Sequence, residues 1–327
     1  MGIETRLTRR FALAHPIISA PMAFAAGGRL AAAVSAAGGL GLIGGGYGDR
    51  AWLEEQFAAA GNQAVGCGFI TWSLRKQPEL LDLVLARKPK ALFLSFDDPE
   101  PFASRAKAAG VPVMCQVQTR GDAERALEAG ADVIVAQGAE AGGHGEKRAT
   151  LTLVPEVADL IAARGPETLL CAAGGIADGR GLAACLMLGA DGVLVGSRLW
   201  ASSEANVPAS MHAAAIDATG DETVRSSVMD LVRGLEWPQR FTARVLRNPF
   251  TDRWHGREAE LMAAASVEAP RWLKAWAEGD VSIANTFVGE AAGLIHAIEP
   301  AAAIISRMAA DAERHLRLDQ PSRIALR

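Results

Sequence analysis

The chain is poor in the features that mark several large classes of protein. Its 327 residues include four cysteines, too few and too scattered for a disulfide framework: Cys67, Cys115, Cys171 and Cys185. None forms a CxxC pair or stands beside a histidine at metal-ligand spacing, so no metal site is expected. The net charge is −4 with both signs scattered, which gives no electrostatic footprint for nucleic acid or an acidic membrane.

Long hydrophobic runs are also missing. No run of 18 or more uncharged apolar residues occurs, so a membrane-spanning helix is not expected. Three arginines precede the apolar stretch 11–26, which resembles a signal peptide, but His15, Pro16 and Pro21 interrupt it. We interpret this stretch as a first strand and a glycine turn. A cytoplasmic protein with reduced thiols is expected, and the oligomeric state stays open, a homo-oligomer included.

Half of the residues are hydrophobic, enough for a large core, and one pattern recurs along the chain. A segment of helical periodicity ends at a glycine, and a short β-branched run follows, as in residues 128–135 and 188–195. The glycine suits the left-handed position just past a helix C-terminus. The run after it lacks alternation, which is typical of a parallel strand buried on both faces.

These runs predict eight strands, most of them separated by room for one helix. They cover residues 17–20, 40–43, 64–68, 91–95, 112–116, 132–136, 169–172 and 192–195. Alternating strands and helices in this number predict an α/β fold, the (β/α)8 TIM barrel. A doubly wound open sheet is the structural alternative.

The pattern changes after the eighth strand. Residues 206–279 show helical patterns without further buried strands, which predicts a small helical subdomain inserted into a barrel made of residues 1–205 and 280–327. The last barrel helix is expected over residues 291–315. The insert holds four of the seven tryptophans: Trp237, Trp254, Trp272 and Trp276. They form either the core of the insert or the lining of a substrate entrance.

Three glycine-rich turns follow the sixth, seventh and eighth predicted strands. They read Gly142-Gly143-His144, Ala173-Gly174-Gly175 and Gly196-Ser197. In such barrels chemistry takes place at the C-terminal ends of the strands, and phosphate often binds after strands seven and eight. Backbone N–H groups without a neighbouring Cβ suit a phosphate dianion. The three turns therefore predict one active site.

His144 is the candidate catalytic residue. A lone histidine is often a surface or hydrogen-bonded loop residue, but this one follows a strand, stands between glycines and lies in the longest connection of the barrel. An ordinary imidazole pKa near 6.5 suits it to accept a proton near neutral pH. We expect catalysis or direct substrate contact.

Residues at the other strand ends complete the candidate site. They are Pro21, Met22, Gly68, Gln116 and Gln137. Met22, Phe69 and Cys115 would form a flat apolar wall, and the two glutamines would offer hydrogen-bond donors to ring carbonyls or nitrogens. A flat heteroaromatic ring joined to a phosphate fits these residues, and FMN is the common example. The glutamines could instead only fix neighbouring loops.

Four stretches together resemble the nitronate monooxygenase family, formerly called 2-nitropropane dioxygenases. They are residues 20–22, the run from Gln137 to His144, residues 173–176 and residues 196–198. The resemblance implies an FMN-dependent barrel that oxidises alkyl nitronates, and in some members neutral nitroalkanes, with O2. It places the FMN phosphate on Gly174, Gly175, Gly196 and Ser197, and the flavin ring and ribityl chain against Pro21, Met22, Gln116 and Gln137. His144 would be the base for a nitroalkane or would orient the nitro oxygens of a nitronate.

Three positions differ from the family pattern. Gly68 stands where asparagine is frequent, Glu146 where glycine is frequent, and Glu290 where glutamine is usual. These differences concern the substrate rather than the fold or the flavin.

Two other functions stay open. The first is an NAD(P)H-dependent FMN reductase acting on an enoyl thioester or a quinone, with a basic pocket built from Arg198, Arg225, Arg244 and Arg247. The second is a flavin-free lyase or isomerase acting on a sugar phosphate. The predicted apolar wall argues against the second, because such a substrate calls for paired charged residues at the strand ends.

Overall fold

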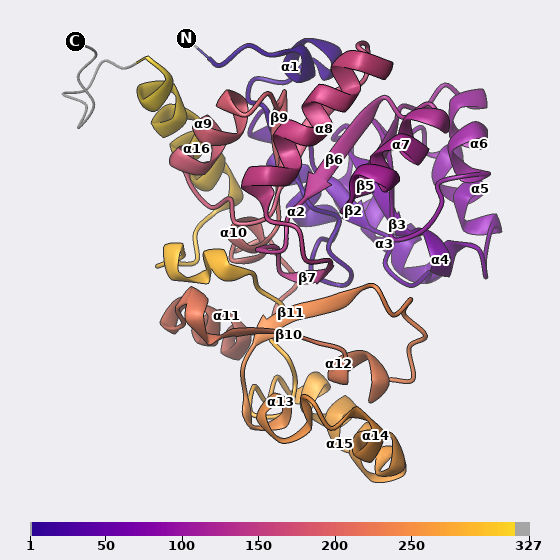
Figure 1. The fold of residues 1–327 in the computed structure, drawn as a ribbon, viewed down its shortest axis with the longest axis vertical. Coiled ribbons are helices and arrows are strands. Elements are labelled where there is room, and N and C mark those ends of the chain that lie inside the picture. The colour runs from indigo at the N-terminus through magenta and orange to yellow at the C-terminus, as the bar shows by residue number, and fades with distance from the viewer. Residues whose placement is uncertain (1, 318–327) are drawn as a thin grey trace.

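Eight parallel strands form a barrel in the computed structural model, which describes residues 2–317 (Figure 1). The strands are β1 (Ile17–Ser19), β2 (Leu42–Gly44), β3 (Gly66–Ile70), β4 (Leu92–Ser95), β5 (Val113–Val117), β6 (Val133–Gln137), β8 (Leu169–Ala173) and β9 (Gly192–Val195). They pair in the order β1-β9-β8-β6-β5-β4-β3-β2, and a parallel bridge between Ile18 and Leu40 brings the two ends together. The predicted TIM barrel is confirmed, and the open sheet is wrong.

Helices surround the barrel. They are α2 (Gly28–Ala36), α3 (Arg50–Ala60), α4 (Thr71–Leu74), α5 (Glu79–Ala86), α6 (Phe102–Ala108), α7 (Arg120–Glu128), α8 (Thr150–Arg164), α9 (Gly179–Met187), α10 (Ser197–Trp200) and α16 (Ala301–Leu316). The glycines expected just past helix ends adopt left-handed backbone, with φ of +87° at Gly38, +71° at Gly130 and +95° at Gly189. At each of these glycines the left-handed backbone turns the chain directly into the next buried strand.

Two apolar layers hold the barrel together. Side chains such as Phe93, Met114 and Leu194 fill its interior, and Leu7 and Phe11 of α1 (Arg6–Phe11) pack against them. The second layer lies between strands and helices and includes Phe69, Cys115 and many aliphatic residues. Within residues 2–317, no helix combines the length and the hydropathy needed to cross a bilayer.

The inserted segment is not purely helical, which corrects the prediction. It contains α11 (Ala209–Asp217), η1 (Gly220–Glu222), α12 (Val228–Leu231), α13 (Pro249–Trp254), α14 (Glu258–Ala263) and α15 (Ala265–Glu278), but also β10 (Thr223–Ser226) and β11 (Thr242–Leu246). These strands alternate buried and half-buried residues and carry an arginine each, so they lack the continuous apolar run that marked the barrel strands.

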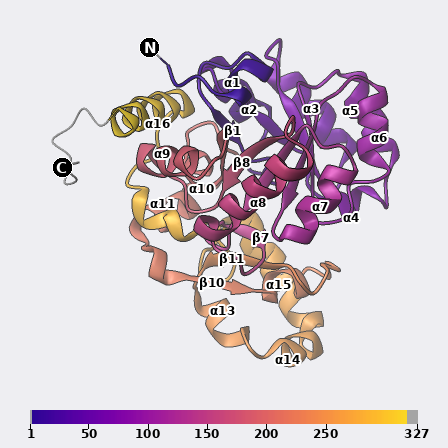
Figure 2. The ribbon, with the colours of Figure 1, turned by 45° about the horizontal axis from the view of Figure 1, so that its top comes forward.

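A second sheet joins the insert to the barrel. Strand β11 pairs antiparallel with both β10 and the short strand β7 (Gly143–Gly145), which belongs to the long connection after β6. His144 is therefore a strand residue paired with Ala243, not a loop residue as predicted. Figures 1 and 2 show this small sheet at the junction, with the orange helices of the insert beyond it.

The expected last helix over 291–315 is shorter than predicted. A 3-10 turn, η2 (Glu290–Leu294), comes first, and α16 begins only at Ala301. Pro300 stands at the N-cap of α16. A proline inside a helix would remove one hydrogen bond and clash with the preceding turn, so the chain breaks there.

Candidate functional site

A single cavity at the C-terminal ends of the strands brings together residues that are far apart in the chain. Its wall includes twelve of the thirteen residues that the sequence singled out: Pro21, Met22, Gln116, Gln137, Gly142, Gly143, His144, Ala173, Gly174, Gly175, Gly196 and Ser197. Their convergence agrees with the rule that barrel enzymes build their sites at this rim. Their individual roles stay predictions.

Gly68 is the exception, and the predicted apolar wall is partly wrong. Gly68 does not line the cavity. A Cβ at Gly68 would lie 2.5 Å from Cγ of Pro21, so Gly68 allows the backbone to pack closely against Pro21. Phe69 and Cys115 face the surrounding helices, because successive side chains of a strand point to opposite faces. Ile70, Phe93 and Leu194 supply the apolar wall instead, with Met22.

The turns after β8 and β9 present bare backbone to the cavity. Gly174 and Gly175 have φ of +102° and +74°, a conformation that side chains disfavour. The amide N–H groups of Gly174, Gly175, Gly196 and Ser197 donate no backbone hydrogen bond within residues 2–317. Gly174, Gly196 and Ser197 are half-buried, whereas Gly175 is exposed. Partly buried amides without partners need an acceptor. An anion such as a phosphate fits this cradle.

Gly289 and Glu290, at the start of η2, pack against this cradle and fix it in place. The N–H of Gly289 donates to Oγ of Ser197 at 2.9 Å, and the N–H of Glu290 donates to the carbonyl of Glu140 at 2.9 Å. A Cβ at Gly142 would lie 2.6 Å from the nitrogen of Gly289. Glycine at position 142 is therefore needed for the close approach of two backbones.

His144 forms a buried pair with Asp230, which the sequence did not reveal. Nε2 of His144 lies 2.8 Å from Oδ2 of Asp230, and the two side chains are 9% and 3% exposed. Asp230 belongs to α12 of the insert, 86 residues further along the chain. Because a carboxylate only accepts hydrogen bonds, Nε2 carries the proton and donates it. The other ring nitrogen, Nδ1, then carries a lone pair, and it makes no hydrogen bond to residues 2–317.

The pKa of His144 lies below the ordinary value. Burial lowers it most, while the hydrogen bond and the charge of Asp230 raise it and offset part of the effect. The cationic side chains of Arg233 and Arg225 lower it further. The imidazole is therefore neutral at neutral pH and able to accept a proton at Nδ1.

Aromatic side chains surround the imidazole. The Trp237 ring stacks on His144 with 3.4 Å between ring centroids and 6° between planes. The indole Nε1 of Trp237 donates to the hydroxyl of Tyr47, the one tyrosine of the chain, at 3.1 Å. Burial raises the pKa of Tyr47, so its hydroxyl keeps its proton. These contacts fix the orientation of the imidazole ring and of the Trp237 and Tyr47 side chains, which line the cavity beside it.

The four tryptophans of the insert divide between the two predicted roles. Trp237 and Trp276 line the cavity. Trp254 and Trp272 are buried with Val245 in the core of the insert.

Arg233 is the cationic side chain in the cavity wall. Its Nε donates to the carbonyl of Met229 at 2.7 Å, and Nη2 donates to Oδ1 of Asp230 at 2.8 Å. Asp230 thus accepts from His144 on one oxygen and from Arg233 on the other. This ion pair leaves the buried carboxylate compensated, which makes its burial tolerable.

The glutamines at the strand ends bind one another. Oε1 of Gln137 accepts hydrogen bonds from Nε2 of Gln116 at 3.2 Å and from Nε2 of Gln118 at 2.9 Å. Gln118 was missed by the sequence analysis because it lies one residue past the end of β5. The amide network fixes the orientation of Gln116 and Gln137, both of which line the cavity.

The four arginines expected to form a basic pocket lie elsewhere. Arg225 and Arg244 are cross-strand neighbours on β10 and β11, and both donate to the carbonyl of Ala139. Burial, together with the charge of Arg244, lowers the pKa of Arg225 to about 10. Arg198 binds Glu299, and Arg247 pairs with Asp252 on the surface. None of the four lines the cavity.

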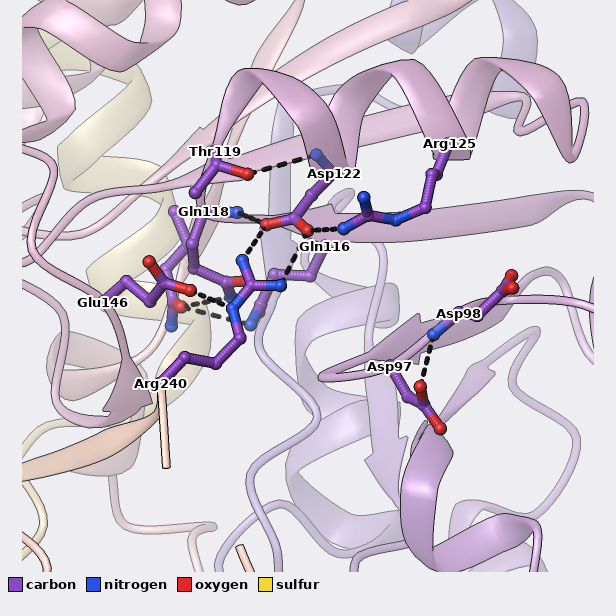
Figure 3. Close-up of polar contacts among 10 residues, drawn as sticks. Asp97, Asp98, Gln116, Gln118, Thr119, Asp122, Arg125, Glu146 and Arg240 are labelled. Atoms are coloured by element: carbon purple, nitrogen blue, oxygen red, sulfur yellow. Dashed lines mark hydrogen bonds and ion pairs between the residues drawn. The ribbon is translucent and has the colours of Figure 1, made fainter. Parts of the chain in front are cut away.

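An ion-pair network also ties the insert to the barrel, as Figure 3 shows. Arg240 of the insert donates to both oxygens of Asp122, at 3.1 and 2.6 Å, and also to Glu146. Burial alone would raise the pKa of Asp122, but hydrogen bonds from Arg240 and Thr119 hold it below the usual value. Glu146 and Glu290, two departures from the family pattern, thus both pair with arginines of the insert, Glu290 with Arg244 at 2.8 Å.

Acidic and histidine side chains form no metal centre in the part of the chain that the structure describes. No group of three or more histidine, cysteine, aspartate or glutamate residues in 2–317 is placed to hold a metal ion. Fold and site together define a (β/α)8 barrel enzyme with an anion cradle and a buried histidine–aspartate pair at one rim.

Comparison with known proteins narrows this class. The family model described as nitronate monooxygenase matches residues 4–62 and 51–311. A nitronate monooxygenase of Neurospora crassa is 33% identical and aligned over 92% of this chain and 90% of that protein. The chain belongs to the nitronate monooxygenase family and is an oxidoreductase.

Two further proteins resemble the chain over almost its whole length. One is a 5-hydroxy-7a-methyl-1-oxo-octahydro-1H-indene-4-carboxyl-CoA dehydrogenase of Mycobacterium tuberculosis, 28% identical over 97% of this chain and 98% of that protein. The other is the solved structure of FabK from Thermotoga maritima, with a TM-score of 0.84, 30% identity and coverage of 97% and 98%.

Proposed function

We propose that the protein binds FMN and oxidises alkyl nitronates with O2, and neutral nitroalkanes after removing a proton from the carbon beside the nitro group. The observation that carries this proposal is His144, which lies in the wall of a cavity that ends in a glycine cradle and is paired with the buried carboxylate of Asp230. Family membership and the name of the Neurospora crassa relative support the same chemistry.

The residues present fit the cofactor. Gly174, Gly175, Gly196 and Ser197 offer the FMN phosphate amides that make no backbone hydrogen bond within residues 2–317. Pro21, Met22, Gln116 and Gln137 would hold the ring and the ribityl chain. When bound, FMN supplies the two-electron oxidation of the nitronate and the return of the electrons to O2.

The chain's own contribution is proton transfer and orientation. Nδ1 of His144 accepts the proton from the carbon of a neutral nitroalkane, because Nε2 already donates to Asp230. The carboxylate of Asp230 then stabilises the imidazolium, and the indole face of Trp237 adds a cation–π contact. A nitronate needs no proton removal, so it bypasses this step.

The test begins with the purified protein, which we expect to be yellow and to release FMN on denaturation. Anaerobic mixing with the nitronate of 1-nitropropane should bleach the flavin absorbance, and air should restore it. Colourless protein without FMN uptake, or flavin that the nitronate leaves oxidised, would contradict the proposal.

A second candidate is an NAD(P)H-dependent FMN reductase acting on an enoyl thioester or a quinone. The similarity to a carboxyl-CoA dehydrogenase over 97% of the chain favours it. The absence of Arg198, Arg225, Arg244 and Arg247 from the cavity wall argues against the basic pocket expected for it. Rapid bleaching by NADH under anaerobic conditions, without bleaching by the nitronate, would select the reductase.

A further inference from the structure

Arg233 and Tyr47 present hydrogen-bond donors in the cavity that the protein itself does not use. The guanidinium binds the carbonyl of Met229 through Nε and Asp230 through Nη2, and it also makes a side-chain hydrogen-bond contact with the Tyr47 hydroxyl. A guanidinium carries five N–H groups, so these three contacts leave N–H donors over. The hydroxyl of Tyr47 accepts from Trp237 and is contacted by the Arg233 guanidinium, and its own O–H donates to no group within residues 2–317. Both residues line the cavity beside His144.

The surroundings of Arg233 strengthen its attraction for an anion. Its side chain is 14% exposed, and its guanidinium carbon lies 5.8 Å from the Tyr47 ring, 5.3 Å from the Trp272 ring and 5.8 Å from the Phe287 ring. Aromatic walls hold the planar cation in place and exclude water. A donor that is oriented and poorly hydrated binds an oxyanion more strongly than a surface arginine does.

The charge balance of the cluster leaves room for one anion. Asp230 is shared between Arg233 and His144, so the three groups sum to zero while the imidazole is neutral. When His144 takes up a proton the sum becomes +1. An anion beside Arg233 then compensates the imidazolium, and the two events favour each other.

We propose that Arg233 and Tyr47 form a specificity-determining subsite for a planar two-oxygen anion on the substrate, either the nitronate group or a carboxylate. The proposal rests on the proposed function for the identity of the substrate, but the binding chemistry is independent of turnover. Guanidinium N–H groups match both oxygens of such a group, and the Tyr47 hydroxyl adds a third donor.

Binding of butyrate and of its neutral analogue butanamide tests the subsite directly, by calorimetry on the flavin-loaded protein. Wild type should bind butyrate at least tenfold more tightly than butanamide. Arg233→Met should abolish this preference, and Tyr47→Phe, which keeps the Arg233–Asp230 ion pair, should reduce it severalfold. Arg247→Met, the matched control on the surface of the insert, should keep it. Equal binding of the two ligands by wild type, or a preference that survives in Arg233→Met, overturns the proposal.

Turnover then identifies which anion the subsite holds. If it is the nitronate, Arg233→Met lowers kcat/KM by at least tenfold for the nitronates of both 1-nitropropane and 3-nitropropionate. If the subsite holds a carboxylate, kcat/KM falls by at least tenfold only for the nitronate of 3-nitropropionate. Unchanged kcat/KM for both compounds overturns the subsite. A protein that oxidises neither compound but binds butyrate selectively contradicts the proposed function and leaves the subsite standing.

Discussion

The turns after β8 and β9 offer the cavity their backbone, whereas the insert offers it side chains. Gly174, Gly175 and Gly196 bring amides and no charge. Arg233 and Trp237 bring a guanidinium and an indole to its wall from a region of different architecture, and Asp230 of the same region binds His144. Under the proposed function, the glycine turns bind the cofactor and the insert determines the substrate. Changing each part separately tests this division.

The largest effect is expected at the junction, for His144→Ala. Loss of a general base should lower kcat/KM for neutral nitroalkanes by about 10²–10⁴-fold, while nitronates lose far less and FMN stays bound. Steady-state oxygen consumption with both substrate forms measures the ratio. His255→Ala on the insert, where the ring contacts Ser226, is the control. Equal losses for nitroalkane and nitronate would mean that the imidazole does not act as a base.

Asp230→Asn should affect the same proton transfer, because Asp230 of the insert binds His144. The pKa of His144 is already low, and removal of the negative charge should lower it further, since Asp230 raises it in the folded protein. In the proposed mechanism the neutral imidazole is the active form, so activity should fall as pH drops through this pKa, and the acidic limb of the kcat/KM profile should move to lower pH in Asp230→Asn. We expect nitroalkane turnover to fall about 10–100-fold, the loss typical when the hydrogen-bond partner that orients a metal-ligating histidine is removed. If the acidic limb of the kcat/KM profile stays at the same pH, Asp230 does not control the ionisation of the catalytic base.

The contrast between the two regions also explains what could be predicted from the sequence. The glycine turns and the strand ends are local patterns: a run of apolar residues followed by Gly174-Gly175 means the same thing wherever the strand packs. Asp230 carries no such signal, because its partner lies 86 residues away and meets it only through the β7–β11 pairing. Arg233 and Tyr47 were missed for the same reason. Even the strands β10 and β11 were hidden, because their partly exposed residues break the apolar run.

Gly174→Ala should impair the cofactor and spare the chemistry of the insert. A Cβ there would lie 2.9 Å from the carbonyl oxygen of Gly138 and 3.0 Å from Oγ1 of Thr150, on a residue with φ of +102°. Such strain costs roughly 1–3 kcal/mol, so the Kd for FMN should rise about tenfold. Fluorescence titration of the flavin-free protein measures it.

Gly110→Ala separates backbone strain from the cradle itself. Gly110 has φ of +71°, but a Cβ there meets nothing within 4 Å, and the residue lies outside the cavity wall. This variant should lose stability without losing FMN affinity. An equal loss of FMN affinity in both variants would show that Gly174 matters only through stability.

Arg240→Ala should have the smallest effect, because its ion pairs with Asp122 and Glu146 hold the two regions together without touching the cavity. Arg240 is 41% exposed, so its coupling to Asp122 in a double-mutant cycle should be about 0.2–1 kcal/mol and should shrink with salt. The pKa of Asp122 is lowered in the folded protein, so this contribution is present above the ordinary carboxyl pKa of about 3.9 and is lost as pH falls through the lowered value. Nitronate turnover should stay within a few-fold of wild type, since Tyr47 still holds Trp237. Arg240→Ala could instead lower turnover as far as Asp230→Asn does. That result would mean that the insert contributes mainly through its position on the barrel, and not through Asp230, Arg233 and Trp237.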